Sequence, residues 1–356
     1  MINSGGGGSR FSVRKCDNAK MPGPPERGAW PKVPERAISP DMSNVLFIKT
    51  SSLGDVIHHM PALTELRRNR PDARISWVVE EAFAPLVRLH AGVDVVIPVA
   101  TRRWRKGLHR PATWRELKDF VVGLRARSYD EIIDTQGLVR TAVIAKLARG
   151  RRHGYDARSV REPPAARFYD VRHQIDQGLH AIARNRLLTA AALGHTPDDI
   201  LDFGLDRAGL AGQAGAPYGV LLHATARRGK EWPEQSWVEL GRMLAGRGVE
   251  LLLPWGTSVE RERSVRVAAG LGRARVPERE PLDTVARLIA GAAFVIGVDT
   301  GLLHLAAALG VPLVGIFVGS EPGLTGPRGV GPIAVVGGRA AMPSARDVAS
   351  ALDQIS

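Results

Sequence analysis

The sequence is poor in cysteine and in long apolar stretches, and each shortage excludes a class of protein. Its single cysteine, Cys16, excludes an internal disulfide framework and a cysteine-based metal site, and it is consistent with a reducing compartment. No apolar run approaches the roughly 18 residues that cross a bilayer. The N-terminus lacks the apolar core of a signal peptide. We therefore expect a soluble protein of the cytoplasm.

Two recognisable motifs are also missing. No Gly-x-Gly-x-x-Gly follows an apolar strand, which argues against a dehydrogenase with a dinucleotide cofactor. No nucleic-acid-binding motif is present, and the aromatic residues, only 5% of the chain, are not interleaved with a basic helix. A basic nucleic-acid-binding protein therefore remains only a distant alternative.

Acidic residues are outnumbered, and the excess of positive charge is unevenly placed. The chain of 356 residues has a net charge of +13. Residues 43–205 carry 26 Lys and Arg against 18 Asp and Glu, whereas residues 206–356 carry 16 against 14. Such a basic region is typical of a protein with an anionic partner, such as a nucleic acid, a membrane surface or a phosphorylated substrate. The Arg-rich composition of a GC-rich genome is the alternative explanation.

The order of apolar segments predicts an α/β protein. Residues 1–42 are rich in glycine and proline and have no sustained apolar periodicity, so we expect a disordered tail. From residue 45 onward, short apolar strands alternate with helical patterns, and a Gly/Ala-rich linker lies at 204–217. We expect two Rossmann-like, doubly wound domains, at 43–210 and 211–356. A long helix is predicted at 56–70 and a closing helix, with Ser344 as its N-cap, at 345–355.

The segment 45–63 contains the strongest candidate for a reacting group. An apolar strand at 45–48 runs into the small and polar residues 50–54, which suit a tight strand-to-helix turn, and Asp55 follows. Ligands of open α/β sheets gather at the carboxyl ends of the strands, where a carboxylate can act as a general base. The alternative, which the spacing alone favours, is that Asp55 is the N-cap of the helix.

Polar residues follow three strands of the second domain and complement one anionic ligand. Asp299-Thr-Gly stands where a helix begins, so its backbone N–H groups suit a phosphate, or Asp299 only caps the helix. Lys230 could neutralise a diphosphate, although a lysine in such a loop is more often simply exposed to solvent. Glu260 suits the hydroxyls of a ribose, or it is a first-turn glutamate favoured by the helix dipole.

Six motifs in this chain resemble those of the lipopolysaccharide core heptosyltransferase I family, inverting enzymes of glycosyltransferase family nine with the GT-B fold. The resemblance extends from about residue 43 to the end. The motifs are Lys-Thr-Ser-Ser-Leu-Gly-Asp (49–55), Arg-Arg-Trp-Arg-Lys (102–106), Asp-Thr-Gln-Gly-Leu-Val (134–139), His-Ala-Thr-Ala-Arg-Arg-Gly-Lys-Glu-Trp-Pro (223–233), Leu-Pro-Trp-Gly-Thr (253–257) and Val-Asp-Thr-Gly-Leu-Leu-His-Leu (298–305).

The resemblance implies a reaction and its site residues. The donor is ADP-L-glycero-D-manno-heptose, the acceptor is the inner Kdo sugar of Kdo-lipid A, and Asp55 is the catalytic base, assisted by Lys230. The donor-binding residues it implies are Thr225, Lys230, Glu260, Asp299, Thr300, Gly301 and His304. The acceptor-binding residues it implies are Ser51, Ser52, Gly54, Arg102, Arg103, Arg105, Lys106 and Gln136.

The resemblance also bears on partners and cofactors. The two domains are expected to face each other across a cleft, and the basic first domain is expected to dock, without inserting, on the cytoplasmic face of the anionic inner membrane. The chain has no Asp-x-Asp sequence, a common metal ligand of other glycosyltransferases, so we expect no metal and no cofactor. One alternative stays open, another GT-B glycosyltransferase such as a later heptosyltransferase. From the residues alone, the basic run at 101–106 is expected to be a solvated loop.

Overall fold

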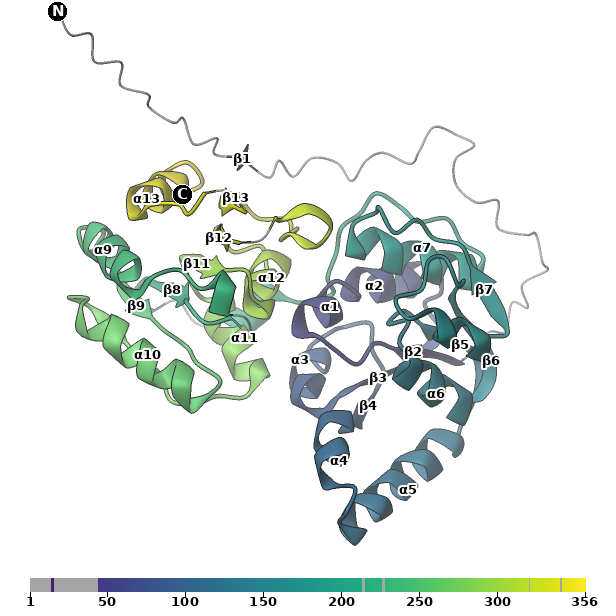
Figure 1. The fold of residues 1–356 in the computed structure, drawn as a ribbon. Coiled ribbons are helices and arrows are strands. Elements are labelled where there is room, and N and C mark those ends of the chain that lie inside the picture. Colours follow the sequence, from purple (N-terminus) through teal and green to yellow (C-terminus); the bar gives the residue numbers. More distant parts are fainter. Residues whose placement is uncertain (1–13, 16–43, 213–214, 226–227, 320, 340) are drawn as a thin grey trace, which may run out of the picture.

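The protein, studied here as a computed structural model, consists of two α/β halves, each built on a parallel sheet (Figure 1). The structure describes residues 14–15, 44–212, 215–225, 228–319, 321–339 and 341–356. The predicted GT-B architecture, with two doubly wound, Rossmann-like domains, is confirmed. The exact bounds predicted for the two domains remain predictions.

The sheet of the first half has the strand order β4-β3-β2-β5-β6-β7, and all of its pairings are parallel. Residues Val45 to Ile48 are completely buried, as expected for a strand covered on both faces. The strands are β2 (Asn44–Ile48), β3 (Arg74–Glu80), β4 (Val95–Val99), β5 (Ser128–Asp134), β6 (Arg149–Tyr155) and β7 (Val171–His173). The helices are α1 (Leu53–Ile57), α2 (Met60–Asn69), η1 (Glu81–Phe83), α3 (Ala84–Val87), α4 (Thr101–Gly107), α5 (Pro111–Arg125), α6 (Val139–Leu147), η2 (Pro163–Phe168) and α7 (Ala181–Leu193).

The sheet of the second half has the order β1-β13-β12-β11-β8-β9-β10 and is parallel except for β1. Its strands are β8 (Tyr218–Leu222), β9 (Glu250–Leu252), β10 (Ala274–Arg275), β11 (Phe294–Val298), β12 (Leu313–Val318) and β13 (Ile333–Gly338). Its helices are α8 (Arg207–Ala211), η3 (Arg228–Lys230), α9 (Glu234–Ala245), α10 (Ser258–Ala269), α11 (Leu282–Ala290), α12 (Gly301–Ala308), η4 (Gly323–Thr325) and α13 (Ala345–Asp353). Ser344 caps α13, as predicted.

The N-terminal segment is described at two residues only. Arg14–Lys15 form β1, which pairs antiparallel with β13 at the edge of the second sheet. The remaining residues of the segment, 1–13 and 16–43, lie outside the described residues, so disorder of this tail remains a prediction. None of the described helices is long and apolar enough to cross a membrane.

Two predictions about helices were wrong. The helix predicted at 56–70 is two helices, because the chain turns at His58 and His59 and α2 starts afresh with Pro61 in its first turn. The basic run at 101–106 is not a loop but helix α4. The carboxylate of Glu80 accepts hydrogen bonds from Thr101 Oγ1 (2.8 Å) and Arg102 N (3.0 Å). It thereby gives a partner to one of the backbone N–H groups that have none within the first turn of a helix.

Candidate active site

Asp55 lies in the first turn of α1, directly beyond the carboxyl end of β2. The N-cap of this helix is Ser52, not Asp55. The Asp55 carboxylate closes a capping box by accepting hydrogen bonds from Ser52 N (2.9 Å) and Ser52 Oγ (3.0 Å). Its side chain keeps 26% of its surface exposed, so it remains open to a ligand while the helix start holds it in place.

A polar cavity of about 320 Å³ lies beside Asp55. Residues from the ends of β2, β5 and β6 and from α7 line it, and Thr325 of the second half closes one side. Besides Thr325, the polar lining residues are Lys49, Asp55, Thr135, Gln136, Tyr155, Ser159, Arg161, Gln177, Arg184 and Asn185. Three cations and one carboxylate face this space, so it suits an anionic ligand that carries a hydroxyl group toward Asp55.

Lys49 is the most deeply placed of the three cations. Its Nζ donates hydrogen bonds to Thr135 O (2.8 Å) and to Asn185 Oδ1 (3.3 Å). Burial lowers the pKa of Lys49 to about 8, although the carboxylates of Asp55 and Asp134 act in the opposite direction. Lys49 therefore carries its charge at neutral pH and loses it in mildly alkaline solution.

The other two cations are held by different means. Arg161 Nη1 lies 3.8 Å from Asp55 Oδ2, which places a guanidinium at the carboxylate without a direct hydrogen bond. Arg184 donates from Nη2 to Ser159 O (2.8 Å) and stacks over the ring of Tyr155 at 5.0 Å. These contacts hold the guanidinium groups at the cavity wall before any ligand binds.

The small residues predicted to bind the acceptor lie around Asp55, but they differ in accessibility. Ser51 is buried; its N–H donates to Gln136 Oε1 (3.2 Å), and its Oγ accepts from Arg140 Nη2 (3.1 Å). Gln136 reaches the cavity wall itself. Gly54 faces His304 of the second half so closely that a Cβ there would lie 2.9 Å from the imidazole Cδ2.

In the second half, three of the predicted donor-binding residues meet. Lys230 forms an ion pair with the carboxylate of Asp299, and Thr225 Oγ1 donates to Asp299 O (3.0 Å). Thr300 follows as the N-cap of α12, and Gly301 is its first residue. A lysine and the free N–H groups of a helix start therefore lie next to one another, an arrangement that binds phosphate well.

His304 connects this cluster to Asp55. It is buried one turn into α12, and its ring centroid lies 4.5 Å from that of His58. Burial lowers the pKa of His304 to about 4, while the carboxylates of Asp299 and Asp55 raise it. The imidazole is therefore neutral at physiological pH, and it interacts electrostatically with both carboxylates that the sequence singled out, Asp55 and Asp299.

The starts of α1 and α12 touch across the two halves. Besides the contact of Gly54 with His304, a Cβ on Gly301 would lie 2.7 Å from the Cβ of Leu53. Both helices can approach this closely only because glycine stands at these two positions. The contact brings the predicted phosphate-binding helix start to the predicted base.

Glu260 takes the structural role that the sequence left open. Its carboxylate accepts from Gly256 N (2.8 Å) and Thr257 N (3.0 Å), and Thr257 Oγ1 accepts from Glu260 N, so the two residues form the capping box of α10. The first-turn interpretation is therefore confirmed. Contact with a ribose remains a prediction.

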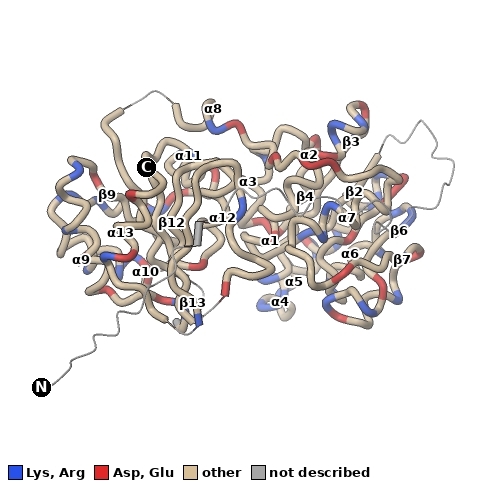
Figure 2. The backbone as a smooth tube through the Cα atoms, turned by 90° about the horizontal axis from the view of Figure 1, so that it is seen from above, with Lys and Arg blue, Asp and Glu red and all other residues tan. Residues whose placement is uncertain are grey.

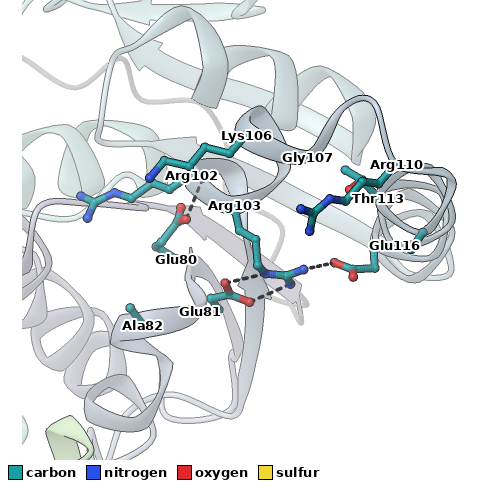
Figure 3. A pocket seen from close by; sticks show the side chains of 11 residues that line it. Glu80, Glu81, Ala82, Arg102, Arg103, Lys106, Gly107, Arg110, Thr113 and Glu116 are labelled. Carbon is teal, nitrogen blue, oxygen red and sulfur yellow. Dashed lines mark hydrogen bonds and ion pairs between the residues drawn. The ribbon is translucent and has the colours of Figure 1, made fainter.

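The basic residues of α4 line a second cavity, of about 530 Å³, between α4, the start of α5 and residues 80–82 (Figure 3). Arg103 is tied by ion pairs to Glu81 (3.0 Å) and Glu116 (2.7 Å), which raise its pKa. Arg102 and Lys106 also line the cavity, whereas Arg105 is exposed and does not.

Sequence reasoning predicted only two of the polar residues that line the first cavity, Asp55 and Gln136. It missed all three of the cations, Lys49, Arg161 and Arg184, and also Asn185. Lys49 stands directly after the buried strand β2, a signal that was present in the sequence. Arg161 comes from a loop, Arg184 and Asn185 come from α7, and no local pattern joins the loop to the helix. Among the described residues, no group of three or more His, Cys, Asp or Glu side chains is arranged to hold a metal ion.

Comparison with known proteins gives consistent matches. Residues 118–353 match the family model for "Glycosyltransferase family 9 (heptosyltransferase)". Lipopolysaccharide heptosyltransferase 1 of Pseudomonas aeruginosa is 46% identical over 288 residues, which span 80% of this chain and 81% of that protein. The same-named protein of Escherichia coli K12 is 44% identical over 290 residues, 80% of this chain and 91% of that one.

Solved structures give the same match in three dimensions. E. coli heptosyltransferase WaaC with ADP superposes with a TM-score of 0.83 at 40% identity, covering 88% of this chain and 99% of that one. The structure of the same E. coli enzyme with ADP-2-deoxy-2-fluoro heptose superposes with a TM-score of 0.80 at 39% identity and the same coverage.

Proposed function

Because the chain belongs to glycosyltransferase family 9, the heptosyltransferases, we propose that it transfers L-glycero-D-manno-heptose from ADP-L-glycero-D-manno-heptose to the inner Kdo of Kdo-lipid A, a step of lipopolysaccharide core synthesis. The observation that carries this proposal is the position of Asp55. Its carboxylate lies between a cationic cavity in the first half and a phosphate-binding helix start in the second.

The donor fits the second half. The diphosphate of ADP-heptose would lie at the start of α12. There, Lys230 and the N–H groups of Thr300 and Gly301 would bind its negatively charged oxygens. Thr225 and Asp299 hold Lys230 in that position. His304, neutral and next to both Asp299 and Asp55, suits a sugar hydroxyl better than a phosphate because it adds no charge. Glu260 is proposed to reach the ribose through the outer oxygen of its carboxylate.

The acceptor fits the cavity beside Asp55. A Kdo sugar carries a carboxylate, and Lys49, Arg161 and Arg184 offer three positive charges around a space of about 320 Å³. Ser51 and Gln136 stabilise the loop that holds Asp55, and Ser52 and Gly54 form the helix start below it. Arg102, Arg103, Arg105 and Lys106 of α4 are proposed to meet the more distant phosphates and carboxylates of the acceptor.

The reaction is a single displacement with inversion. Asp55 accepts the proton of the acceptor hydroxyl while that oxygen bonds to the anomeric carbon of heptose. The bond from the anomeric carbon to the phosphate oxygen breaks on the opposite face, and ADP leaves with the electron pair. Lys230 and the α12 amides stabilise the charge that grows on the diphosphate, a task for which we assign no metal ion.

The lipid-linked acceptor places the enzyme at a membrane. We propose that it works as a peripheral protein on the cytoplasmic face of the inner membrane, and that the basic first half meets the anionic lipid surface. The net charge of +8 over residues 43–205 supports this assignment.

The test is a coupled assay of ADP release. We expect release from ADP-heptose only when a Kdo-lipid A acceptor is present, and we expect it to persist in excess EDTA. Transfer only to an acceptor that already carries heptose would instead identify a later heptosyltransferase. A loss of activity in EDTA that Mg²⁺ restores would overturn the metal-free assignment.

A further inference from the structure

Helices α4 and α5 form a hairpin that projects from the first half (Figure 1). Trp104 of α4 fixes the two helices to each other: its ring packs edge-on against Phe120 at 5.5 Å, and its Nε1 donates to Glu116 Oε2 (2.8 Å). Gly107 lies against Thr113, whose Oγ1 would be 2.8 Å from an added Cβ. The hairpin is therefore a rigid unit and not a loose loop.

Helix α5 buries one apolar face and also carries two large apolar residues that are exposed, which its own packing does not require. Thr113 and Leu124 are buried, Leu117 and Phe120 are partly buried, and this spacing is that of the face that packs on the protein core. On the other side, Trp114 is 60% exposed and Val122 is 58% exposed, eight residues apart on one face. Leu108, in the turn before α5, is 49% exposed.

The indole of Trp114 is oriented for a boundary between water and lipid. Its Nε1 donates to Leu108 O (2.9 Å), so its one polar group is satisfied within the hairpin. The rest of the ring is apolar surface. Tryptophan is enriched at the headgroup level of membranes because its ring is amphipathic, and an exposed ring such as that of Trp114 suits this position.

Positive charge surrounds these apolar residues. Residues 101–127 contain nine Lys and Arg against two Asp and Glu, a net charge of +7, whereas all of residues 43–205 carry +8. Figure 2 shows basic residues following one another along α4. Arg115, Lys118 and Arg125 are exposed on α5 beside Trp114 and Val122. These three do not line the cavity of about 530 Å³ on the inner side of the hairpin.

We propose that the α4–α5 hairpin is the element that docks the enzyme on an anionic phospholipid bilayer, with Leu108, Trp114 and Val122 inserted at the headgroup level and Arg115, Lys118 and Arg125 against the lipid phosphates. Exposed apolar residues ringed by basic ones are the signature of an interfacial helix. The inference rests on the proposed function, because the lipid of the acceptor would lie in that bilayer. The sequence led us to expect docking without insertion, and this proposal replaces that expectation with shallow insertion of three side chains.

The first experiment measures binding of the full chain to vesicles of phosphatidylethanolamine with about a quarter phosphatidylglycerol. Neutralising Arg115, Lys118 and Arg125 to glutamine should lower the partition constant about 100-fold, on the order of fivefold per charge. Leu108→Ser with Trp114→Ser should lower it about tenfold or more. Val259→Ser, at a residue 68% exposed on α10, and Arg242→Gln, at an exposed residue of α9, are matched controls that should change nothing.

The second experiment measures insertion directly. Brominated lipids should quench part of the tryptophan fluorescence of the parent, and Trp114→Phe should remove that quenching while keeping vesicle binding. If the hairpin variants bind vesicles as the parent does, or if quenching is the same in Trp114→Phe, the proposal is wrong. Retention on heparin without vesicle binding would also overturn it.

A third measurement separates this inference from the proposed function. On a water-soluble, deacylated Kdo acceptor, the hairpin variants should transfer heptose at the parental rate and keep the parental melting temperature, because the substituted side chains are exposed. If the parent itself transfers no heptose, the proposed function fails whatever the vesicles show.

Discussion

At the scale of single residues, the side chain of Asp55 has a structural task and, in our proposal, a chemical one. It closes the capping box of α1 through Ser52 and also faces the cationic cavity. Because both Ser52 contacts go to Oδ2, the helix start fixes the carboxylate without using all of its lone pairs. The hypothesis that Asp55 is the N-cap is therefore wrong, because Ser52 caps the helix and Asp55 closes the capping box from the first turn. The hypothesis that Asp55 is the base remains a prediction.

Lys49 gives this site a measurable pH dependence. Its pKa of about 8 means that the ammonium is charged below pH 8 and neutral above it. We expect kcat/KM for the Kdo acceptor, which reports groups of the free enzyme, to fall as pH rises through about 8. Lys49→Met should lower kcat/KM roughly 10- to 100-fold at pH 7 and abolish the fall. If kcat/KM of Lys49→Met still falls at alkaline pH as in the parent, a group other than Lys49 causes the pH dependence.

The sequence predicted those residues of this site that belong to a local motif, and it missed those that only tertiary packing brings to the cavity. Asp55 and the Asp299-Thr-Gly segment were found because each belongs to a strand-to-helix turn, and the resemblance to the family motifs gave each its role. Arg161 and Arg184 reach the same cavity from a loop and from α7, and only the packing of α7 against the sheet brings them together. The sequence placed Lys230 and Asp299 around one ligand, but it did not predict their ion pair, because 69 residues separate them.

At the scale of elements, the proposed active site depends on the contact of two helix starts. Helix α1 brings Asp55, α12 brings the N–H groups proposed to bind phosphate, and glycine at positions 54 and 301 lets the two helices touch. A methyl group on either glycine would push the base away from the donor. Displacements of about 1 Å at a reacting centre can reduce a rate about 100-fold.

Substitution of Gly301 tests this contact. The new Cβ of Gly301→Ala would lie 2.7–2.8 Å from Leu53 atoms, so we expect turnover to fall roughly 10- to 100-fold. Gly123→Ala in α5 is the matched control, because nothing lies within 4 Å of its added Cβ. It should leave turnover unchanged and stabilise the protein by about 0.5–1 kcal/mol, measured by thermal unfolding. Parental turnover in Gly301→Ala would show that the contact is dispensable.

Elements that are strongly periodic were predicted from the sequence, and those that depend on tertiary contacts were not. The buried strand β2 and the capped helix α13 follow from local patterns. The helix at 101–107 was predicted as a loop because its sequence is basic. Its helical form depends on Glu80, some twenty residues away, and on the packing of Trp104 against Phe120.

At the scale of the whole molecule, we propose that the two halves divide the substrates between them. The first half would supply the base and the cationic cavity, and the second would supply the helix start that binds the diphosphate. Substitutions in the first half should therefore alter acceptor binding or chemistry, and those in the second should alter donor binding. The N-terminal segment reaches neither site in the part of the chain that the structure describes.

Removal of residues 1–41 tests the role of that segment. Only Arg14–Lys15 of this stretch make described contacts, as a two-residue strand at the edge of the second sheet. We expect the truncated protein to keep its turnover and its melting temperature. A marked loss of either would show that the segment supports the fold or the site.

The most direct test of the account is Asp55→Asn, measured by single-turnover kinetics together with ADP-heptose binding. Asparagine can still accept a hydrogen bond from Ser52, so the helix start should be preserved, but it cannot take up a proton at neutral pH. We expect the rate of transfer to fall by about 10²–10⁴ with unchanged donor affinity, whereas Lys230→Ala should also weaken donor binding. A single-turnover rate for Asp55→Asn within a few-fold of the parent would contradict the assignment of Asp55 as the base.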